Sequence, residues 1–204
     1  IKLRSTTTEI FGATSTADLN LVGAFENTMG DWAIDWSSAP SLQYIGPHAF
    51  AGSGVASVDI YAPSVKFGMG ESAFEGCANL THVSVTAKTL SIGDTAFANC
   101  TALQSACFIA NESPTSDDVH YLNKNNIGFG VFSGDAAFVS LTVGSPVPQL
   151  VYPSPKIAYV FDGAVEANEE AVRISLHVPE GEERAYINAW VYNLLGYSDY
   201  DDCY

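Results

Sequence analysis

The sequence predicts a repeat solenoid that is mainly β, with a parallel strand ladder, short helical turns and a C-terminal cap helix. One segment recurs three times, as IGPHAFAGSGVASVDI (45–60), VKFGMGESAFEGCANLTHVSV (65–85) and LSIGDTAFANCTALQSACF (90–108). The shared Ala-Phe step places Phe50, Phe74 and Phe97 at intervals of 24 and 23 residues. A fixed period of about 20 to 29 residues is typical of solenoids in which each repeat adds one strand.

Each repeat, or rung, predicts two strands and one turn. After the Phe, apolar and polar residues alternate, so that Val83 and Val85 point inward while His82 and Ser84 point outward. The pieces KFG and LSIG predict a second, shorter strand, and SAFEG and TAFAN are long enough for one helical turn. Because no rung can bury its apolar face alone, the rungs are expected to stack.

Residues 1–36 are predicted to form an N-terminal cap and a degenerate repeat. Phe25 lies 25 residues before Phe50 in the same Gly-Ala-Phe setting, and Trp32 and Trp36 replace smaller residues. Terminal repeats are atypical because they close the core, so the two Trp rings are expected to form a lid. The chain starts at Ile1 without an initiator Met or a signal-like apolar segment, and we expect it to be part of a longer protein.

Regular repeats are predicted over residues 37–109 and irregular repeats over 127–178, separated by an insertion at 110–126. The insertion is polar, and it places Phe132 35 residues after Phe97. It is either a neutral surface loop or part of a binding face, where solenoid insertions often lie. Four prolines between 146 and 155 predict an extended connection without strand pairing.

The C-terminal segment, 179–204, is predicted to contain a cap helix and an acidic end. Pro179 ends a strand, and acidic residues follow where a helix N-terminus favours negative charge. From Ala185 to Leu195 apolar residues recur with the spacing of one helical face. With 204 residues, of which 47% are hydrophobic, the chain can bury a core, and the whole of it, 1–204, is predicted to be a single domain.

The net charge excludes some partners. Eight Lys and Arg stand against 23 Asp and Glu, which gives a formal charge of −15. This field repels phosphate backbones, so no nucleic acid partner is expected. No apolar run reaches the length of about 18 residues that a membrane-spanning helix needs, so no transmembrane segment is expected in this chain.

The residues that could carry chemistry predict neither catalysis nor a metal site nor a cofactor. The four histidines lack metal-binding spacing, and no G-x-S-x-G elbow is present. The acidic end, with Asp199, Asp201 and Asp202, lacks the Gly and closing Glu of an EF-hand. Cys77 and Cys100 hold the same place in successive rungs and are expected to be small buried side chains, with a disulfide between them left open.

The outward strand positions are the candidate ligand-binding residues. Small polar side chains are predicted to align in two rows, Ser57, His82, Ser105 and Ser140, and Asp59, Ser84, Cys107 and Thr142. Tyr61, at the margin of these rows, is the exposed aromatic residue most suited to anchor a partner. His82 is predicted to be a solvated surface histidine. The alternative is that all these residues only solvate the sheet.

The frame IG-x-x-AF-x-x-C-x-x-L, read in IGDTAFANCTAL, resembles the BspA-like leucine-rich repeats of bacterial surface proteins. The closing motif VPEG-x-x-x-AY-x-x-AW, from Val178, is similar to the end of such proteins, so the resemblance covers roughly residues 21–196. Phe129 and Phe132 lie in a poorer frame, and Ala106-Cys107 replaces the usual β-branched pair.

The resemblance implies a bacterial protein that is extracellular or anchored at the cell surface. It also implies a non-enzymatic binding or adhesion module that recognises a protein or glycan ligand on a host or neighbouring cell surface. The alternative is a structural spacer that displays other domains of a longer surface protein. A spacer needs no preferred face, whereas a binding module predicts clustered surface aromatics or an ordered 110–126 loop.

Overall fold

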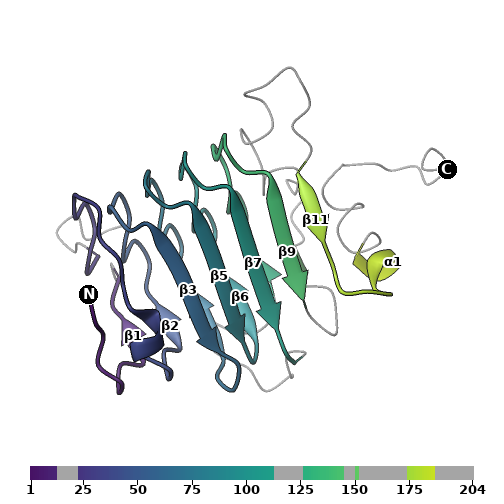
Figure 1. Ribbon diagram of the computed structural model, residues 1–204, viewed down its shortest axis with the longest axis horizontal. Helices are drawn as coiled ribbons and strands as arrows, with labels where there is room; N and C mark the ends of the chain where they lie inside the picture. Colours follow the sequence, from purple (N-terminus) through teal and green to yellow (C-terminus); the bar gives the residue numbers. More distant parts are fainter. Residues whose placement is uncertain (13–22, 113–125, 145–149, 152–173, 187–204) are drawn as a thin grey trace.

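The computed structural model describes residues 1–12, 23–112, 126–144, 150–151 and 174–186, which form two parallel sheets (Figure 1). The short-strand ladder has the order β1 (Glu9–Ile10), β2 (Tyr44–Ile45), β4 (Phe67–Met69), β6 (Leu90–Ile92), β8 (Asn126–Ile127) and β10 (Leu150–Val151). The long-strand ladder has the order β3 (Ser57–Ala62), β5 (His82–Ala87), β7 (Ser105–Ala110), β9 (Ser140–Gly144) and β11 (Ser175–His177).

From β2 to β11, successive strands of the chain alternate between the two ladders, as the predicted rung requires. In Figure 1 the long-strand ladder lies in front, and the short strands lie behind it. Each long strand pairs with its neighbour one residue to one residue, for example Val58 with Val83 and Val83 with Ala106. A mainly β repeat fold with parallel strand ladders is therefore confirmed.

The core between the ladders is built on a column of stacked Phe rings. Phe25, Phe50, Phe74, Phe97 and Phe132 stack in that order, with centroid distances of 4.8, 4.8, 5.4 and 6.1 Å. All but Phe25, which packs partly buried against the core, are fully buried. Val83 and Val85 are also fully buried, as the alternation of the sequence predicts.

The turns that carry the Phe rings are not helical, which corrects the prediction of short helical turns. In the second regular rung, Glu75 N–H donates to Ser72 O (3.1 Å) and Cys77 N–H donates to Phe74 O (3.2 Å). Ser72 and Gly76, however, have φ angles of 52° and 70°, in the left-handed region. A right-handed helix cannot propagate through such residues. Helices in the described part of the chain are η1 (Trp36–Ser38) and α1 (Glu183–Tyr186).

The two Trp residues pack against the N-terminal rings of the Phe column. The ring of Trp36 meets Phe50 edge-on at 5.9 Å, and its indole N–H donates to Ser57 O (3.1 Å). Trp32 packs against Phe25 at 5.5 Å. Both Trp rings therefore contact the first rings of the column, and their role as a lid stays a prediction.

Three predicted boundaries change in the structure. Ala110 ends β7 and Asn126 starts β8, so both belong to strands rather than to the insertion, whose residues 113–125 lie outside the described residues. Leu150–Val151 pairs with β8, so the connection between the prolines is not without strand pairing. These two residues keep the N–H groups that proline lacks, which leaves them able to join the ladder.

At the C-terminal end, the strand predicted before Pro179 is present as β11, which pairs with β9. Helix α1 begins at Glu183, and the predicted cap helix from Ala185 extends beyond Tyr186 into residues outside the described ones. The acidic end at Asp199–Asp202 also lies outside them.

Candidate functional site: the outer face of the long-strand ladder

The outward side chains of β3, β5, β7 and β9 form one continuous surface, here called the ladder face. Both predicted rows are in register: Ser57 pairs with His82, Ser105 and Ser140, and Asp59 pairs with Ser84, Cys107 and Thr142. On β11, Ser175 and His177 extend the two rows by one strand. A third row follows at the strand ends, with Tyr61, Thr86, Ile109 and Gly144. Ligand binding by these residues stays a prediction.

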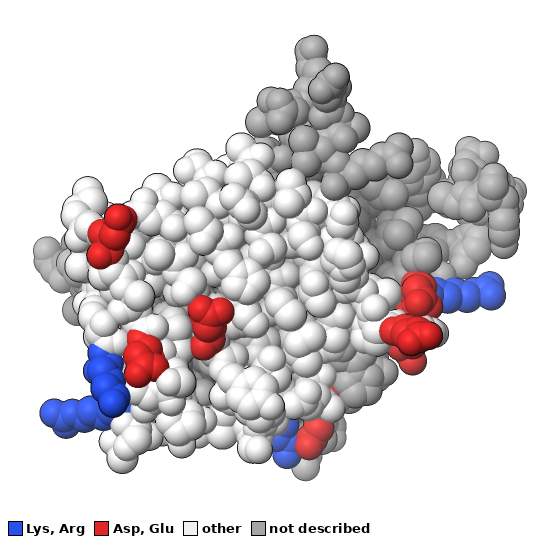
Figure 2. Space-filling view, in the orientation of Figure 1, with Lys and Arg blue, Asp and Glu red and all other residues white. Residues whose placement is uncertain are grey.

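The ladder face is almost free of charge. Of its twelve outward residues on β3, β5, β7 and β9, Asp59 is the one with a formal charge. Figure 2 shows the same contrast, because the surface over the middle strands is white and most charged side chains lie toward the margins. The chain has a net charge of −15, yet Asp59 is the one acidic residue at these twelve positions.

The polar groups at the centre of the ladder face bind one another across β5 and β7. His82 Nδ1 and Ser105 Oγ lie 2.8 Å apart, and His82 is half-buried, which corrects the prediction of a solvated surface histidine. In the next row burial raises the pKa of the Cys107 thiol, while a hydrogen bond with the Ser84 side chain lowers it. These pairs fix the side chains at the centre before any partner is present.

Tyr61 is the large aromatic side chain at the margin of the ladder face. It is 75% exposed, in agreement with the sequence. Two other exposed aromatic residues were not anticipated, Phe11 (74%) and Phe129 (42%). Phe11 follows β1 and Phe129 follows β8, so both belong to the side of the short-strand ladder.

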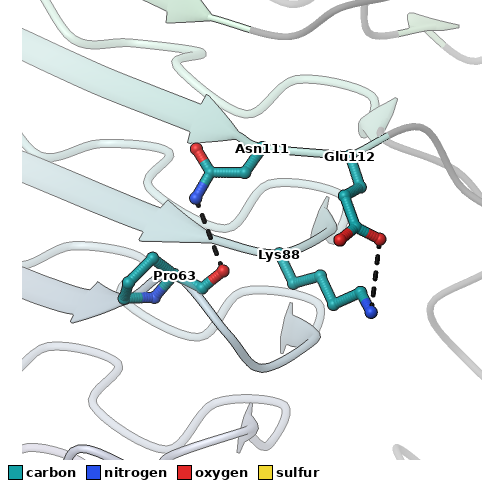
Figure 3. Close-up of polar contacts among 4 residues, drawn as sticks. All are labelled: Pro63, Lys88, Asn111 and Glu112. Atoms are coloured by element: carbon teal, nitrogen blue, oxygen red, sulfur yellow. Dashed lines mark hydrogen bonds and ion pairs between the residues drawn. The ribbon is translucent and has the colours of Figure 1, made fainter.

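A polar cluster at the exit of the long strands was missed by the sequence analysis (Figure 3). Asn111 Nδ2 donates to Pro63 O (3.4 Å), and Lys88 Nζ lies 3.2 Å from Glu112 Oε2. Pro63, Lys88 and Asn111 each follow the last residue of a long strand, so their alignment could have been inferred from the repeat. The ion pair is well exposed, and such pairs contribute about 0–1 kcal/mol.

Four residues inside the turns form an inner polar column. They lie three positions after Phe50, Phe74, Phe97 and Phe132, and are Ser53, Cys77, Cys100 and Asp135. The thiols of Cys77 and Cys100 are free, and donate to Phe50 O and Phe74 O, each at 3.1 Å. The structure therefore contains no disulfide between them, and burial raises the pKa of Cys100. Asp135 is the one charged residue type in this column, which the sequence analysis did not single out.

The described residues form neither a metal-binding cluster nor a membrane-spanning helix. Among them, no three His, Cys, Asp or Glu side chains gather in an arrangement that could hold a metal ion. None of the helices within the described ranges is long and apolar enough to cross a membrane. The arrangement at the ladder face offers hydrogen bonds and one aromatic ring for recognition.

Comparisons with known proteins agree with the repeat. The family model for a BspA type leucine-rich repeat region, described with six copies, matches residues 23–136, more than half of the chain. The match runs from the turn of Phe25 to the turn of Phe132, and therefore includes the whole described Phe column. No curated protein and no solved structure gives a match.

Proposed function

Because this chain belongs to the BspA-type leucine-rich repeat family, we propose that it is a non-enzymatic binding module whose ladder face docks a protein partner. Repeat families of this kind typically serve as interaction scaffolds, since stacked rungs create an extended surface. The proposed domain is one solenoid over 1–204, with Trp32 and Trp36 as its N-terminal lid and a C-terminal cap helix; the described helix α1 at Glu183–Tyr186 agrees with the start of such a cap.

The observation that carries this proposal is the scarcity of charge on the ladder face of an acidic chain, where Asp59 is the one charged residue among twelve outward positions. Burying an unpaired charge in an interface costs far more than burying a hydroxyl group that finds a hydrogen bond. Interface centres are accordingly depleted of charged residues and enriched in Tyr, Trp and Arg. The scarcity of charge and the exposed Tyr61 at the margin agree with that composition, while the Ser and Thr hydroxyls add hydrogen-bonding groups. A structural spacer needs no such face.

The size of the ladder face predicts the kind of partner. The four strands β3, β5, β7 and β9 are five or six residues long. At a spacing of about 4.8 Å and about 3.3 Å per residue, they cover roughly 350 Å². A standard interface buries about 800 Å² on each partner. The partner would therefore also contact the margins, including Tyr61 and the polar cluster around Lys88, or bind only transiently.

The site of action follows from the same family. BspA-type repeats are associated with bacterial surface proteins, so we place this module outside the cell, secreted or anchored at the surface. There it would recognise a protein on a host or neighbouring cell. A glycan on the same surface is the other candidate ligand, because the hydroxyl rows and Tyr61 could bind sugar hydroxyls and a sugar ring.

The test is a binding screen of the purified chain on arrays of extracellular and cell-surface proteins, with a glycan array in parallel. Tyr61→Ala should weaken the dissociation constant of a protein partner at least tenfold, as loss of an interface anchor does. Phe11→Ala is the matched control, since Phe11 is equally exposed but lies away from the ladder face. Ser84→Lys, which places a charge at the centre of the face, should also weaken binding.

Each outcome separates the candidates. Equal binding by wild type, Tyr61→Ala and Ser84→Lys would exclude the ladder face as the docking surface. A signal on the glycan array alone would replace the protein partner by a glycan. No signal on either array would favour the structural spacer.

A further inference from the structure

Asp135 stands where the regular rungs have a small neutral side chain. In the inner polar column, Ser53, Cys77 and Cys100 precede it at the equivalent positions. Its side chain is fully buried, in the turn that follows the 35-residue step from Phe97 to Phe132. An Asp at this place puts a titratable carboxyl group inside the core.

Two carboxylates cross the junction between the rung of Phe97 and the rung of Phe132, in opposite directions. Asp94 Oδ1 accepts a hydrogen bond from Phe129 N–H (2.8 Å) at the exposed side of the turn. Asp135 Oδ1 accepts one from Cys100 N–H (2.7 Å) inside the core. The same contact, from a carboxylate to a backbone N–H across the junction, is therefore made once in water and once in the interior.

The surroundings of Asp135 disfavour its charge. Asp135 Oδ2 is buried and has no hydrogen-bond partner among the described residues. The titratable groups on the two turns packed together are Asp94, Cys100 and Asp135, with the Cys77 thiol one rung further. In the described part of the chain no Lys, Arg or His forms an ion pair with Asp135. Burial raises the pKa of Asp135 to about 8, despite the hydrogen bond from Cys100 N–H that lowers it.

We propose that Asp135 makes the junction after Phe97 pH-sensitive: protonated, it allows the rung of residues 126–144 to pack, and ionised, it loosens that rung. The same rung supplies β9 to the ladder face, where Ser140 and Thr142 pair with Ser105 and Cys107. The ladder face is thus complete under acidic conditions and loses its β9 end as the pH rises. This device concerns the fold and holds whether or not a partner binds the face.

The direction of the effect follows from proton linkage. In the closed rung the carboxyl group keeps its proton up to about pH 8, whereas in the opened rung it regains the ordinary pKa of about 4. The opened state therefore releases a proton across this range. The equilibrium constant for opening should rise about tenfold per pH unit between about pH 4 and about pH 8, and level off outside it.

Hydrogen exchange of the full chain, followed by mass spectrometry and corrected for the intrinsic exchange rate, measures this opening. Peptides from 126–144 should lose protection about tenfold per pH unit from about pH 5 to about pH 8. Peptides from 67–92 serve as an internal reference and should show a smaller slope. Asp135→Asn should abolish the slope in 126–144, since its amide oxygen still accepts from Cys100 N–H but cannot ionise.

Asp94→Asn is the matched control, because it changes the exposed carboxylate of the same junction and should leave the slope intact. If Asp135→Asn does not fold, Asp135→Ser places at this position the residue that Ser53 provides in the same column. An equal slope in wild type and in the Asp135 variants would overturn the proposal. So would a flat wild-type profile, or a slope shared equally by 67–92.

Discussion

The rung of Phe74 and the rung of Phe132 share one backbone plan and differ in what fills it. Each carries a buried Phe, two left-handed residues around it (Ser72 and Gly76, Gly130 and Gly134), and an outward row in register. In the first rung the inner polar column holds Cys77 and the next core position Leu80. In the second the equivalent residues are Asp135 and Phe138.

This difference separates two roles of the repeat. The stacked Phe rings and the left-handed turn residues recur in both rungs, because neighbouring rungs can stack only if their backbones match. The inner polar column varies from Cys77 to Asp135 without changing the strand register. The apolar frame therefore determines the fold. The inner polar column determines the properties in which one rung differs from another.

The largest expected effect comes from truncating the Phe column. Phe74→Ala and Phe97→Ala should each lower the free energy of unfolding by about 3–5 kcal/mol, as buried Phe truncations do. Phe74 stacks between Phe50 and Phe97 at 4.8 and 5.4 Å, so its removal leaves a cavity with rings on both sides. Urea denaturation of each variant against wild type measures the difference.

Phe132→Ala sharpens the comparison between the two rungs. Phe138 lies 4.3 Å from Phe132 and can move into part of the space, so we expect a cost at the lower end of the same range. A loss below about 1 kcal/mol for Phe74→Ala would show that the column does not support the fold.

The apolar frame could be predicted from the sequence, because the spacing of Phe50, Phe74 and Phe97 and the alternation after each Phe dictate which side chains face inward. The two outward rows followed from the same period. The left-handed φ angles in the turn around Phe74 could not be predicted, since a run such as ESAFEG is also compatible with a helical turn. Ser72 N–H and Gly76 N–H donate to Asp94 O (2.9 Å) and Ala98 O (2.8 Å) of the next rung, contacts between rungs that the local sequence does not reveal.

The properties of Asp135 could not be predicted because the insertion breaks the period. With Phe132 35 residues after Phe97, the residue three positions later lacks an obvious counterpart in the sequence. The stacking of Phe132 on Phe97 at 6.1 Å and the hydrogen bond from Cys100 N–H to Asp135 Oδ1 assign Asp135 to the column of Cys77 and Cys100. The strand pairing of Leu150–Val151 was not predicted either, because the neighbouring prolines indicated an unpaired segment and the strand has only two residues.

A smaller effect is expected from the left-handed glycines. Gly76 and Gly134 have φ angles of 70° and 77°, and alanine at such angles costs about 1–2 kcal/mol. A Cβ on Gly76 would have its nearest neighbour at 3.9 Å, whereas a Cβ on Gly134 would lie 2.5 Å from Asn99 Oδ1. Gly134→Ala should therefore destabilise the protein more than Gly76→Ala, measured by thermal unfolding.

Asn99→Gly provides the control for that contact. Asn99 has a φ angle of 61°, which glycine adopts without strain, and its removal frees the space next to Gly134. Gly134→Ala in the Asn99→Gly background should cost no more than Gly76→Ala. If Gly134→Ala and Gly76→Ala lower the stability equally in the wild-type background, the Asn99 side chain moves aside without a measurable loss of stability.

The smallest expected effect is at Thr95, which stands where the rung of Phe132 has Gly130. Both residues are left-handed, with φ angles of 52° and 60°, and a β-branched residue there is strained. Thr95→Gly should relieve about 1–2 kcal/mol of strain. The substitution should also remove the hydrogen bond between Thr95 Oγ1 and Ser72 Oγ (2.8 Å), which is worth about 1 kcal/mol. Glycine should cost about a further 0.5–1 kcal/mol, because it gives the unfolded chain more conformational entropy. These terms oppose one another, so the free energy of unfolding should change by less than about 0.5 kcal/mol in urea denaturation. A gain above about 1 kcal/mol would mean that strain dominates, and an equal loss would mean that the hydroxyl pair with Ser72 holds the two rungs together.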